Sequence, residues 1–321
     1  MSFSHKLPWA PGTTPLMLAP MQGLTNRGLR HLFAQWVKPD TLFTEFMRVA
    51  PGETSKRLSA SDLGEIAPTE EAIPLVVQLI GHGTAALVAA ARAAQAAGAA
   101  HINLNLGCPF GRMTTGLTGG GMLQQPQLLQ ELIPALRDVV QGSFSVKLRS
   151  GYDNPQQIFS LLPLFEAAKV DFLVLHPRTV LQEYEGMADH GITTRVVQET
   201  SLPVIANGDI RTVSEGLRLL EQTKAVGLML GRGAIADPLL FQRLRERITT
   251  QPAREEQAAM LRYYLSGLLE RYQGQFCGEQ QILGKVKTVF ATMDAPDFAK
   301  QIKGLKKARS IQQFHAQLEL L

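Results

Sequence analysis

Short apolar segments alternate with longer segments of helical periodicity along most of the chain. A run of Val, Ile, Leu and Phe predicts a strand, whereas apolar residues three or four apart predict a helix. The predicted strands are 16–19, 42–46, 75–80, 102–106, 145–149, 172–176, 204–206 and 227–230. The predicted helices between them include 26–36, 84–97, 126–140, 155–168, 190–199 and 212–222. Eight strand-then-helix units over about 250 residues predict an α/β protein with a (β/α)8 TIM barrel rather than an open doubly wound sheet.

The pattern changes after residue 247. The segment 248–256 is predicted to be a linker, and no strand pattern follows it. Apolar residues then recur at helical spacing: Leu261, Leu265, Leu268, Leu269, Ile282, Val286, Val289 and Phe290. This spacing predicts amphipathic helices that pack into a small bundle. We therefore expect a barrel domain over residues 1–247 and a small C-terminal all-α helical domain over residues 248–321.

Composition narrows the class of protein. The chain is 45% hydrophobic and 19% charged, which is ordinary for a globular protein. Two cysteines, Cys108 and Cys277, are too few for a disulfide framework and match no zinc spacing, so we expect no metal. The N-terminus lacks a signal-peptide pattern and no run reaches ~18 apolar residues, so we expect a cytoplasmic protein with no membrane association. The net charge of +4 permits an acidic partner without requiring one.

The segment 101–112 carries the most informative chemistry. Apolar and polar residues alternate along it until Gly107 and Pro109 break the predicted strand on either side of Cys108. A thiol is thereby placed at the tip of a strand, beside the amide of Asn105. A small buried cysteine without chemistry is the ordinary alternative, and the other strand ends decide between the two.

Polar residues gather where the predicted strands end, which is where TIM barrels place their active sites. After the first five strands these are Pro20, Met21, Gln78, Asn105, Lys147 and Arg149. After the last three they are His176, Arg178, Asn207, Gly208, Asp209, Gly231, Arg232 and Gly233. The final two groups occupy the position where such barrels bind phosphate through backbone N–H groups.

Lys147 and Arg149 point to one side of their predicted strand. Burying both without an acid is unfavourable unless a ligand or water meets them, the alternative being that both reach solvent. We expect a phosphate-bearing ligand with a flat polar ring, contacted by Gln78, Lys147 and His176. Flavin mononucleotide (FMN) fits this description, and no Gly-x-Gly-x-x-Gly motif opens a helix near the start as a Rossmann domain requires.

Seven motifs follow one another in order along residues 15–310. They are Ala-Pro-Met-Gln-Gly-Leu-Thr (19–25), Val-Gln-Leu-Ile-Gly (77–81), Asn-Leu-Asn-Leu-Gly-Cys-Pro (103–109), Val-Lys-Leu-Arg-Ser-Gly-Tyr-Asp (146–153), His-Pro-Arg-Thr (176–179), Val-Ile-Ala-Asn-Gly-Asp-Ile (204–210) and Leu-Gly-Arg-Gly-Ala (230–234). Together they resemble the tRNA-dihydrouridine synthases, and the segment 44–49 resembles the bacterial C-type enzymes. Asn26, Phe110 and Pro177 depart from the family pattern, and none of them removes a reactive group.

The resemblance implies an FMN-dependent oxidoreductase that uses NADPH to reduce the 5,6 double bond of a uridine in the tRNA D-loop, at position 16 by analogy with the C-type. It implies that Cys108 is the acid that protonates C5, a role suited to a thiol with an unperturbed pKa of ~8.5. The implied FMN contacts are Pro20, Met21, Gln78, Lys147, His176, Asn207, Gly208, Asp209, Gly231 and Arg232. The implied uridine and tRNA contacts are Arg48, Asn105, Arg149, Arg178, Tyr184, Lys285, Lys287 and Lys303.

The region 284–311 carries seven Lys or Arg residues against two acids, a net charge of +5. Alone this predicts a solvated helix face, but beside an active site for RNA it predicts phosphate contacts. One alternative is a flavin barrel for small molecules, of the dihydroorotate dehydrogenase or ene-reductase kind, which leaves the basic tail unexplained. Another is a catalytically silent RNA-binding scaffold, which Cys108 and Lys147 argue against. We expect a monomer whose partner is tRNA.

Overall fold

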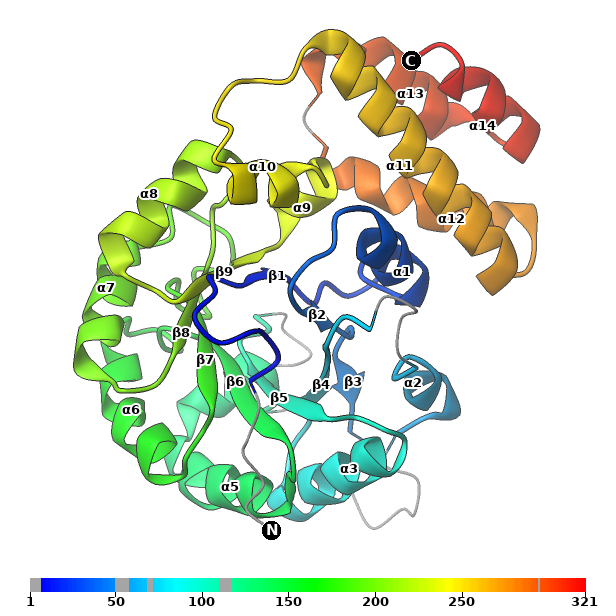
Figure 1. The fold of residues 1–321 in the computed structure, drawn as a ribbon. Helices are drawn as coiled ribbons and strands as arrows, with labels where there is room; N and C mark the ends of the chain where they lie inside the picture. Colours follow the sequence, from blue (N-terminus) through cyan, green and yellow to red (C-terminus); the bar gives the residue numbers. More distant parts are fainter. Residues whose placement is uncertain (1–6, 50–57, 68–71, 110–116, 294) are drawn as a thin grey trace.

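The computed structural model describes residues 7–49, 58–67, 72–109, 117–293 and 295–321. Within them, nine parallel strands form one sheet in the order β1-β9-β8-β7-β6-β5-β4-β2, with β3 beside β4 (Figure 1). The strands are β1 (Leu16–Leu18), β2 (Leu42–Phe43), β3 (Met47–Arg48), β4 (Leu75–Ile80), β5 (His101–Leu106), β6 (Ser143–Arg149), β7 (Phe172–His176), β8 (Val204–Asn207) and β9 (Gly227–Leu230).

The sheet closes on itself between β1 and β2. Met17 forms a parallel bridge with Thr41, and the N–H of Leu18 donates to the carbonyl of Thr41 at 3.0 Å. The barrel is thus complete, and the predicted TIM-barrel fold is confirmed.

The predicted second strand, 42–46, is shorter than expected. β2 ends at Phe43, and Thr44 instead accepts the N–H of Gln78 at its side-chain Oγ1, 3.1 Å away. Because a hydroxyl replaces a backbone carbonyl in the ladder at this point, the segment follows β4 in two pieces, and β3 resumes the pairing at Met47.

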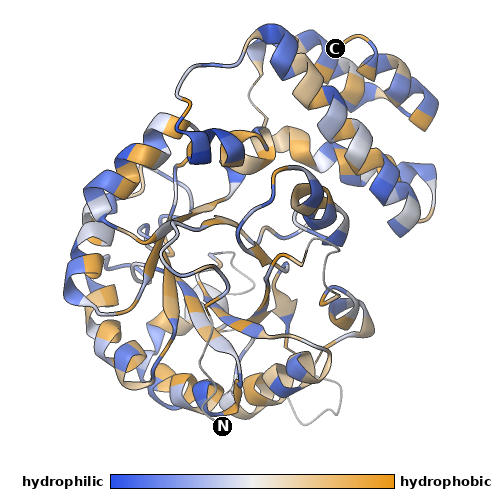
Figure 2. Cartoon of the chain, in the orientation of Figure 1, coloured by the Kyte–Doolittle hydropathy of each residue, from blue (hydrophilic) through white to orange (hydrophobic). Residues whose placement is uncertain are grey.

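A ring of helices surrounds the sheet (Figure 1). It comprises α1 (Arg27–Trp36), α2 (Ala60–Gly64), α3 (Thr84–Ala96), α5 (Pro126–Val139), α6 (Gln157–Ala167), α7 (His190–Glu199), α8 (Val213–Thr223), α9 (Arg232–Ala236) and α10 (Leu240–Glu246), with a 3-10 turn η1 (Gly119–Gln124). Leu129, Leu132, Ile133 and Leu136 of α5 are three or four residues apart and buried. Figure 2 shows apolar and polar residues alternating along the ring helices in the same way. The six helices predicted between the strands all form.

Polar side chains form a continuous ladder inside the barrel. Gln78 Nε2 donates to Asn103 Oδ1 at 2.8 Å, and Asn103 Nδ2 donates to Ser145 Oγ at 2.8 Å. The remaining interior is apolar, and the aromatic ring of Trp9 packs edge-on against Phe172 with centroids 4.9 Å apart. Because these buried amides have partners, they stabilise one register of β4, β5 and β6.

Four helices follow the barrel: α11 (Arg254–Gln275), α12 (Glu279–Lys287), α13 (Ala299–Lys307) and α14 (Ile311–Leu318), with short 3-10 turns η2 (Thr288–Ala291) and η3 (Pro296–Phe298). The eight apolar residues predicted to face inward in this region are all buried. Figure 1 places these helices, coloured yellow to red, beside α1 and α10. The rings of Phe33 in α1 and Tyr264 in α11 lie 6.0 Å apart, so the C-terminal helices and α1 share one hydrophobic core.

Across the described residues, none of the helices has the length and apolar character needed to cross a membrane.

Candidate active site

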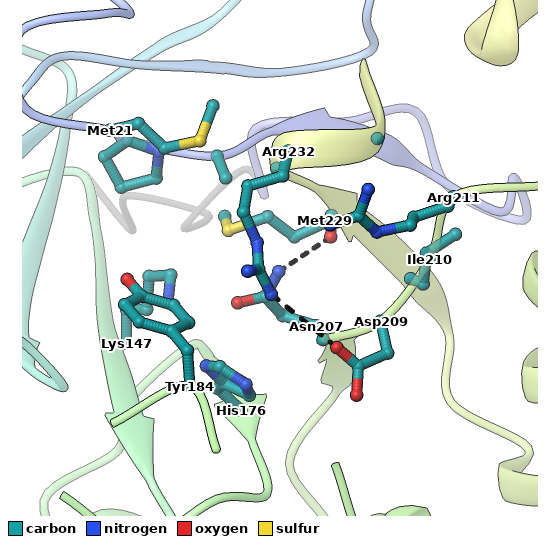
Figure 3. A pocket seen from close by; sticks show the side chains of 15 residues that line it. Met21, Lys147, His176, Tyr184, Asn207, Asp209, Ile210, Arg211, Met229 and Arg232 are labelled. Carbon is teal, nitrogen blue, oxygen red and sulfur yellow. Dashed lines mark hydrogen bonds and ion pairs between the residues drawn. The ribbon is translucent and has the colours of Figure 1, made fainter. Parts of the chain in front are cut away.

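A pocket opens where β1, β6, β7, β8 and β9 end (Figure 3). It is lined by Ala19, Pro20, Met21, Lys147, His176, Tyr184, Asn207, Gly208, Asp209, Ile210, Arg211, Met229, Gly231, Arg232 and Gly233. Nine of the ten residues expected to contact a flavin therefore lie together, since only Gln78 is absent from this lining. Carboxyl ends of parallel strands meet at one end of a barrel, which explains why distant segments converge here.

One corner of the pocket is formed by the loops that follow β8 and β9. Asn207 Nδ2 donates to the carbonyl of Met229 at 2.8 Å and joins the two strand ends. Gly208 has a φ of +124°, and a Cβ there would lie 2.9 Å from the His176 ring. A Cβ on Gly233 would lie 2.2 Å from the carbonyl oxygen of Ile210. The close approach of the two loops thus depends on glycine at position 233, and the approach of the β8 loop to His176 depends on Gly208.

Asp209 orders the cations around this corner. Its carboxylate accepts hydrogen bonds from Arg178 Nη2 at 2.7 Å and from the N–H of Ala188 at 2.8 Å, and Arg232 lies 3.7 Å away. Burial opposes ionisation, but these donors outweigh it and lower the pKa of Asp209 below its ordinary value. The carboxylate of Asp209 therefore forms ion pairs with Arg178 and Arg232. The side chain of Arg232 remains partly exposed at the pocket.

His176 is held as a single neutral tautomer. Arg178 Nη1 lies 3.0 Å from His176 Nε2, and a guanidinium can only donate, so Nε2 accepts and the ring proton sits on Nδ1. Burial, together with the positive charges of Lys147, Arg149 and Arg178, places the pKa of His176 well below its ordinary value. His176 therefore presents a neutral imidazole with an N–H donor in the lining of the pocket.

Lys147 reaches the pocket from β6 without a protein partner. No described residue forms a hydrogen bond or ion pair with its ammonium group. Burial and the charge of Arg149 lower the pKa of Lys147 to about 8, and nearby Cys108 opposes that shift. An unpaired ammonium in a half-buried site is unfavourable unless a ligand meets it, so Lys147 provides a position for an electron-rich group.

Cys108 lies in a rigid turn at the end of β5. Asn105 Oδ1 accepts the N–H groups of Gly107 at 3.0 Å and of Cys108 at 2.9 Å, and the carbonyl of Cys108 accepts from Gly120. The thiol is buried and in no disulfide. Asn105 also donates to Gln78 Oε1 at 2.8 Å, so Gln78 supports the Cys108 turn from the barrel interior. Phe110 falls outside the described residues.

Arg149 and Arg178, expected to contact substrate, are both 2% exposed and bind backbone carbonyls instead. Arg149 donates to the carbonyls of Gly107 at 3.0 Å, Thr179 at 2.7 Å and Glu183 at 2.5 Å. Arg178 donates to the carbonyls of Glu185 at 3.2 Å and Gly186 at 2.6 Å. The two arginines therefore fix the loop 179–188, and Arg149 joins that loop to the Cys108 turn.

The other candidate tRNA contacts differ in their exposure to solvent and in their bonding partners. Arg48 and Lys303 are exposed, and Lys285 Nζ lies 5.5 Å from the centre of the Phe276 ring. Lys287 donates to the carbonyl of Ala308 at the end of α13, so it stabilises the helical region itself. Tyr184 is 47% exposed at the pocket, with its ring 5.4 Å from the Arg149 guanidinium and 4.8 Å from that of Arg232.

Glu45 lies beside the site, although the sequence marked it only as part of the 44–49 motif and predicted no role for it. Its Oε2 accepts the N–H of Gly23 at 2.9 Å, two residues after Met21 of the pocket. Its Oε1 is buried without a hydrogen-bond partner, and burial raises the pKa of Glu45 above its ordinary value. Lys285 of α12 is close enough to lower that pKa in part. Glu45 therefore links the first loop of the pocket to the C-terminal helices.

No group of three His, Cys, Asp or Glu side chains within the described ranges is arranged to hold a metal ion.

Comparison with solved structures identifies the same architecture in known enzymes. Morphinone reductase is 15% identical with a TM-score of 0.53, over 79% of this chain and 94% of that one. The old yellow enzyme homologue from Zymomonas mobilis is 14% identical with a TM-score of 0.55, over 75% of this chain and 91% of that one. At these identities the likeness establishes the fold alone.

Sequence comparison is more specific. A family model described as dihydrouridine synthase (Dus) matches residues 17–317. The probable tRNA-dihydrouridine synthase of Rhodobacter capsulatus is 34% identical over 70% of this chain and 68% of its own length. The tRNA-dihydrouridine(16) synthase of Vibrio vulnificus is 30% identical over 77% of this chain and 80% of its own length. The resemblance noted from the motifs is confirmed, and the chain belongs to the dihydrouridine synthase family.

Proposed function

We propose that this protein reduces the 5,6 double bond of a uridine in the D-loop of tRNA, with FMN as the bound cofactor and NADPH as the reductant. The observation that carries the proposal is the pocket at the barrel mouth. There the unpaired Lys147 lies close to Cys108 and to the corner formed by the loops that follow β8 and β9. Family membership supports the reaction class. The names of relatives such as the Vibrio vulnificus enzyme support position 16 as the target.

The pocket fits a flavin mononucleotide on the chemistry of its donors. Lys147 and His176 Nδ1 supply a charged and a neutral donor for the oxygen and nitrogen atoms of the ring system. At the corner, a Cβ on Gly231 would lie in ordinary van der Waals contact with Met21 Sδ at 3.6 Å and Ala19 Cβ at 3.7 Å, so the backbone at Gly231 is the surface that borders the pocket. Gly231, Gly208 and Arg232 would hold the phosphate, through backbone N–H groups and one positive charge.

Reduction of uracil requires a hydride at C6 and a proton at C5. A flavin held by Lys147, His176 and the corner glycines would supply the hydride once NADPH has reduced it. Cys108 supplies the proton: its S–H bond breaks as a C–H bond forms at C5, and the thiolate left behind later regains a proton from water. Lys147 and Arg149 both lie close enough to Cys108 for electrostatic interaction and therefore stabilise that thiolate.

Asn105 and Arg149 fix the geometry of the proton transfer. Asn105 holds the two backbone N–H groups of the Cys108 turn, and Arg149 holds the carbonyl of Gly107. The turn is therefore ordered before the substrate arrives, which lowers the free energy needed to orient the thiol.

The C-terminal region, residues 248–321, is proposed to bind tRNA phosphates, while residues 1–247 bind the flavin. Turning a base out of a folded RNA requires a few kcal/mol, which contacts elsewhere must offset. Lys303 is exposed on α13, and Lys285 on α12 lies near Glu45, which holds the loop after Met21. Lys285 of the helices thus lies near the loop that follows β1, and Arg48 is exposed on β3.

The decisive experiment combines a spectrum with two assays on the full chain. We expect a flavin absorbance spectrum, NADPH-dependent formation of dihydrouridine in unmodified tRNA, and loss of the modification at position 16 in a strain without the protein. A Lys285→Glu, Lys303→Glu double variant should raise the KM for tRNA while flavin binding stays unchanged. Truncation at residue 253 is unsuitable because α11 shares its core with α1.

Two results would contradict the proposal. Absence of flavin absorbance favours an RNA-binding scaffold without catalysis. Flavin-dependent turnover of dihydroorotate or an activated alkene, with no product in tRNA and no effect of the charge reversals, favours a small-molecule oxidoreductase.

A further inference from the structure

His190 is a half-buried histidine that takes no part in the reaction proposed above. It is the first residue of α7. Its Nε2 lies 3.1 Å from the carbonyl oxygen of Gly208, and its Nδ1 lies 3.2 Å from Thr193 Oγ1. A carbonyl can only accept, so Nε2 carries the ring proton and donates to Gly208, while Nδ1 accepts from the Thr193 hydroxyl. Thr193 is fully buried, so the direction of the His190 donor is fixed.

His190 acts on the pocket without a charge and from outside it. Burial lowers the pKa of His190 below its ordinary value, although the hydrogen bond to Gly208 and the carboxylates of Asp209 and Asp189 oppose that shift. The imidazole is therefore neutral at pH 7. His190 lines a neighbouring cavity instead of the pocket, and Asp209 borders both. Any effect of His190 on a ligand in the pocket must therefore pass through the backbone of Gly208.

The hydrogen bond from His190 orients the peptide between Gly208 and Asp209. This peptide bond is trans, so its C=O and its N–H point in opposite directions. Because the C=O points to His190, the N–H of Asp209 points away from His190. Among the described residues this N–H has no hydrogen-bond acceptor, and Gly208 and Asp209 both line the pocket. We infer that the N–H faces the pocket, where an anion can accept it.

The same peptide could also turn over. Gly208 has a φ of +124° and Asp209 a φ of +49°, and glycine tolerates either orientation of the peptide that follows it. Turning the peptide over would give Asp209 a negative φ, which residues with a Cβ prefer. It would also direct the N–H of Asp209 away from the pocket. In the part of the chain that the structure describes, only His190 donates to the Gly208 carbonyl and opposes this rotation.

We propose that His190 is a positioning residue that holds the N–H of Asp209 toward the phosphate of the bound flavin. The inference rests on the proposed function, which assigns this corner of the pocket to the FMN phosphate. His190 touches neither the phosphate nor the ring system. It selects the orientation of the peptide in which the donor already faces the anion, which lowers the free-energy cost of binding. His190 therefore contributes to the affinity for FMN but not to that for riboflavin, which lacks the phosphate.

The test compares His190→Asn with His190→Gln in the full-length protein after removal of its flavin. The amide nitrogen of glutamine reaches the position of Nε2, whereas that of asparagine reaches only the position of Nδ1. We expect His190→Asn to raise the Kd for FMN at least about tenfold, as loss of a hydrogen bond to a charged group would. His190→Gln should restore most of the affinity. The Kd for riboflavin should be equal in both variants and the wild type, with flavin fluorescence as the readout for both ligands.

His315→Asn is the matched control, because His315 is an exposed histidine on α14. It should leave both Kd values unchanged. An equal rise in the Kd for FMN and for riboflavin in His190→Asn would overturn the positioning role, since it would indicate a general disturbance of the site. Equal losses in the asparagine and glutamine variants would overturn it as well.

The failure of this inference differs from that of the proposed function. A wild type that binds FMN more tightly than riboflavin, together with a His190→Asn variant of unchanged Kd for FMN, overturns the inference alone. A wild type that binds neither flavin contradicts the proposed function and the inference together.

Discussion

Replacement of Lys147 by Met should stabilise the free protein and weaken its binding of the flavin. In the free protein the pKa of Lys147 falls from 10.5 to about 8, chiefly through burial. At about 1.36 kcal/mol per pKa unit, the site disfavours the ammonium form by about 3 kcal/mol. Lys147→Met removes this charge and keeps an apolar side chain of similar length, so we expect the free variant to be more stable than the wild type at pH 7, by up to that amount.

With the flavin bound the stability advantage of the variant should become smaller or disappear. A charged hydrogen bond contributes about 1.5–3 kcal/mol, so the variant should bind FMN about ten- to a hundredfold more weakly. Stabilisation by a ligand grows with the logarithm of its concentration over its Kd. At saturating FMN the difference in stability between the two proteins should therefore shift toward the wild type by about 1.5–3 kcal/mol.

The pH dependence of the free protein gives a second measure. Between about pH 8 and pH 10.5 the unfolded chain retains the Lys147 proton that the folded protein releases. The stability of the wild type therefore rises with pH over this window, and the advantage of Lys147→Met disappears. Differential scanning fluorimetry from pH 6 to pH 10.5, with and without FMN, measures both effects. A free variant that is less stable than the wild type at pH 7 would refute the assignment of Lys147 as an unpaired ligand donor.

Three further substitutions test the site. Cys108→Ala should keep the flavin and its reduction by NADPH but lower dihydrouridine formation at least about 100-fold, because no other acid replaces a positioned proton donor; a tRNA assay by mass spectrometry measures the loss. Arg149→Met removes the donor of three backbone carbonyls, of which that of Thr179 is buried and loses about 1–3 kcal/mol, and should lower both melting temperature and turnover. Glu45→Gln keeps an acceptor for Gly23 and removes a buried charge. Burial raises the pKa of Glu45 from 4.5, so the stability of the wild type falls as pH rises above that value. The stability of the variant should not show this fall with pH.

Two of these substitutions have a control in the same chain. Cys277→Ala changes an exposed thiol and should leave turnover intact. Arg195→Met removes an exposed arginine of α7 and should change the melting temperature little. Equal effects of Arg149→Met and Arg195→Met would contradict the role of Arg149 in holding the loop. A Glu45→Gln protein that is less stable than the wild type at pH 8 would show that the carboxylate is needed.

The barrel and most of the pocket could be predicted because one rule governs both. Apolar strands separated by helices specify a parallel barrel, and parallel strands bring their carboxyl ends together. Residues 207–209 and 231–233, far apart in the chain, therefore meet in one corner as predicted.

The partners of the buried arginines could not be predicted. Arg149 and Arg178 bind backbone carbonyls of a loop, and every residue has such a carbonyl, so no residue type marks the partner. Lys287 illustrates the same limit, because it binds the carbonyl of Ala308 across two helices. Glu45 was missed since its acceptor role toward Gly23 depends on the turn after β1. The early end of β2 likewise depends on one side-chain hydroxyl in the ladder.

The core shared by α1 and α11 makes the barrel mouth and the C-terminal helices one cooperative unit. Phe33, Trp36, Tyr263 and Tyr264 contact one another across that boundary, so heat cannot release the helices and leave the mouth of the barrel intact. Calorimetry of the full chain should therefore record a single endotherm. By the same linkage, an RNA held only by the outer helices should delay the thermal release of the cofactor from a site that it does not touch.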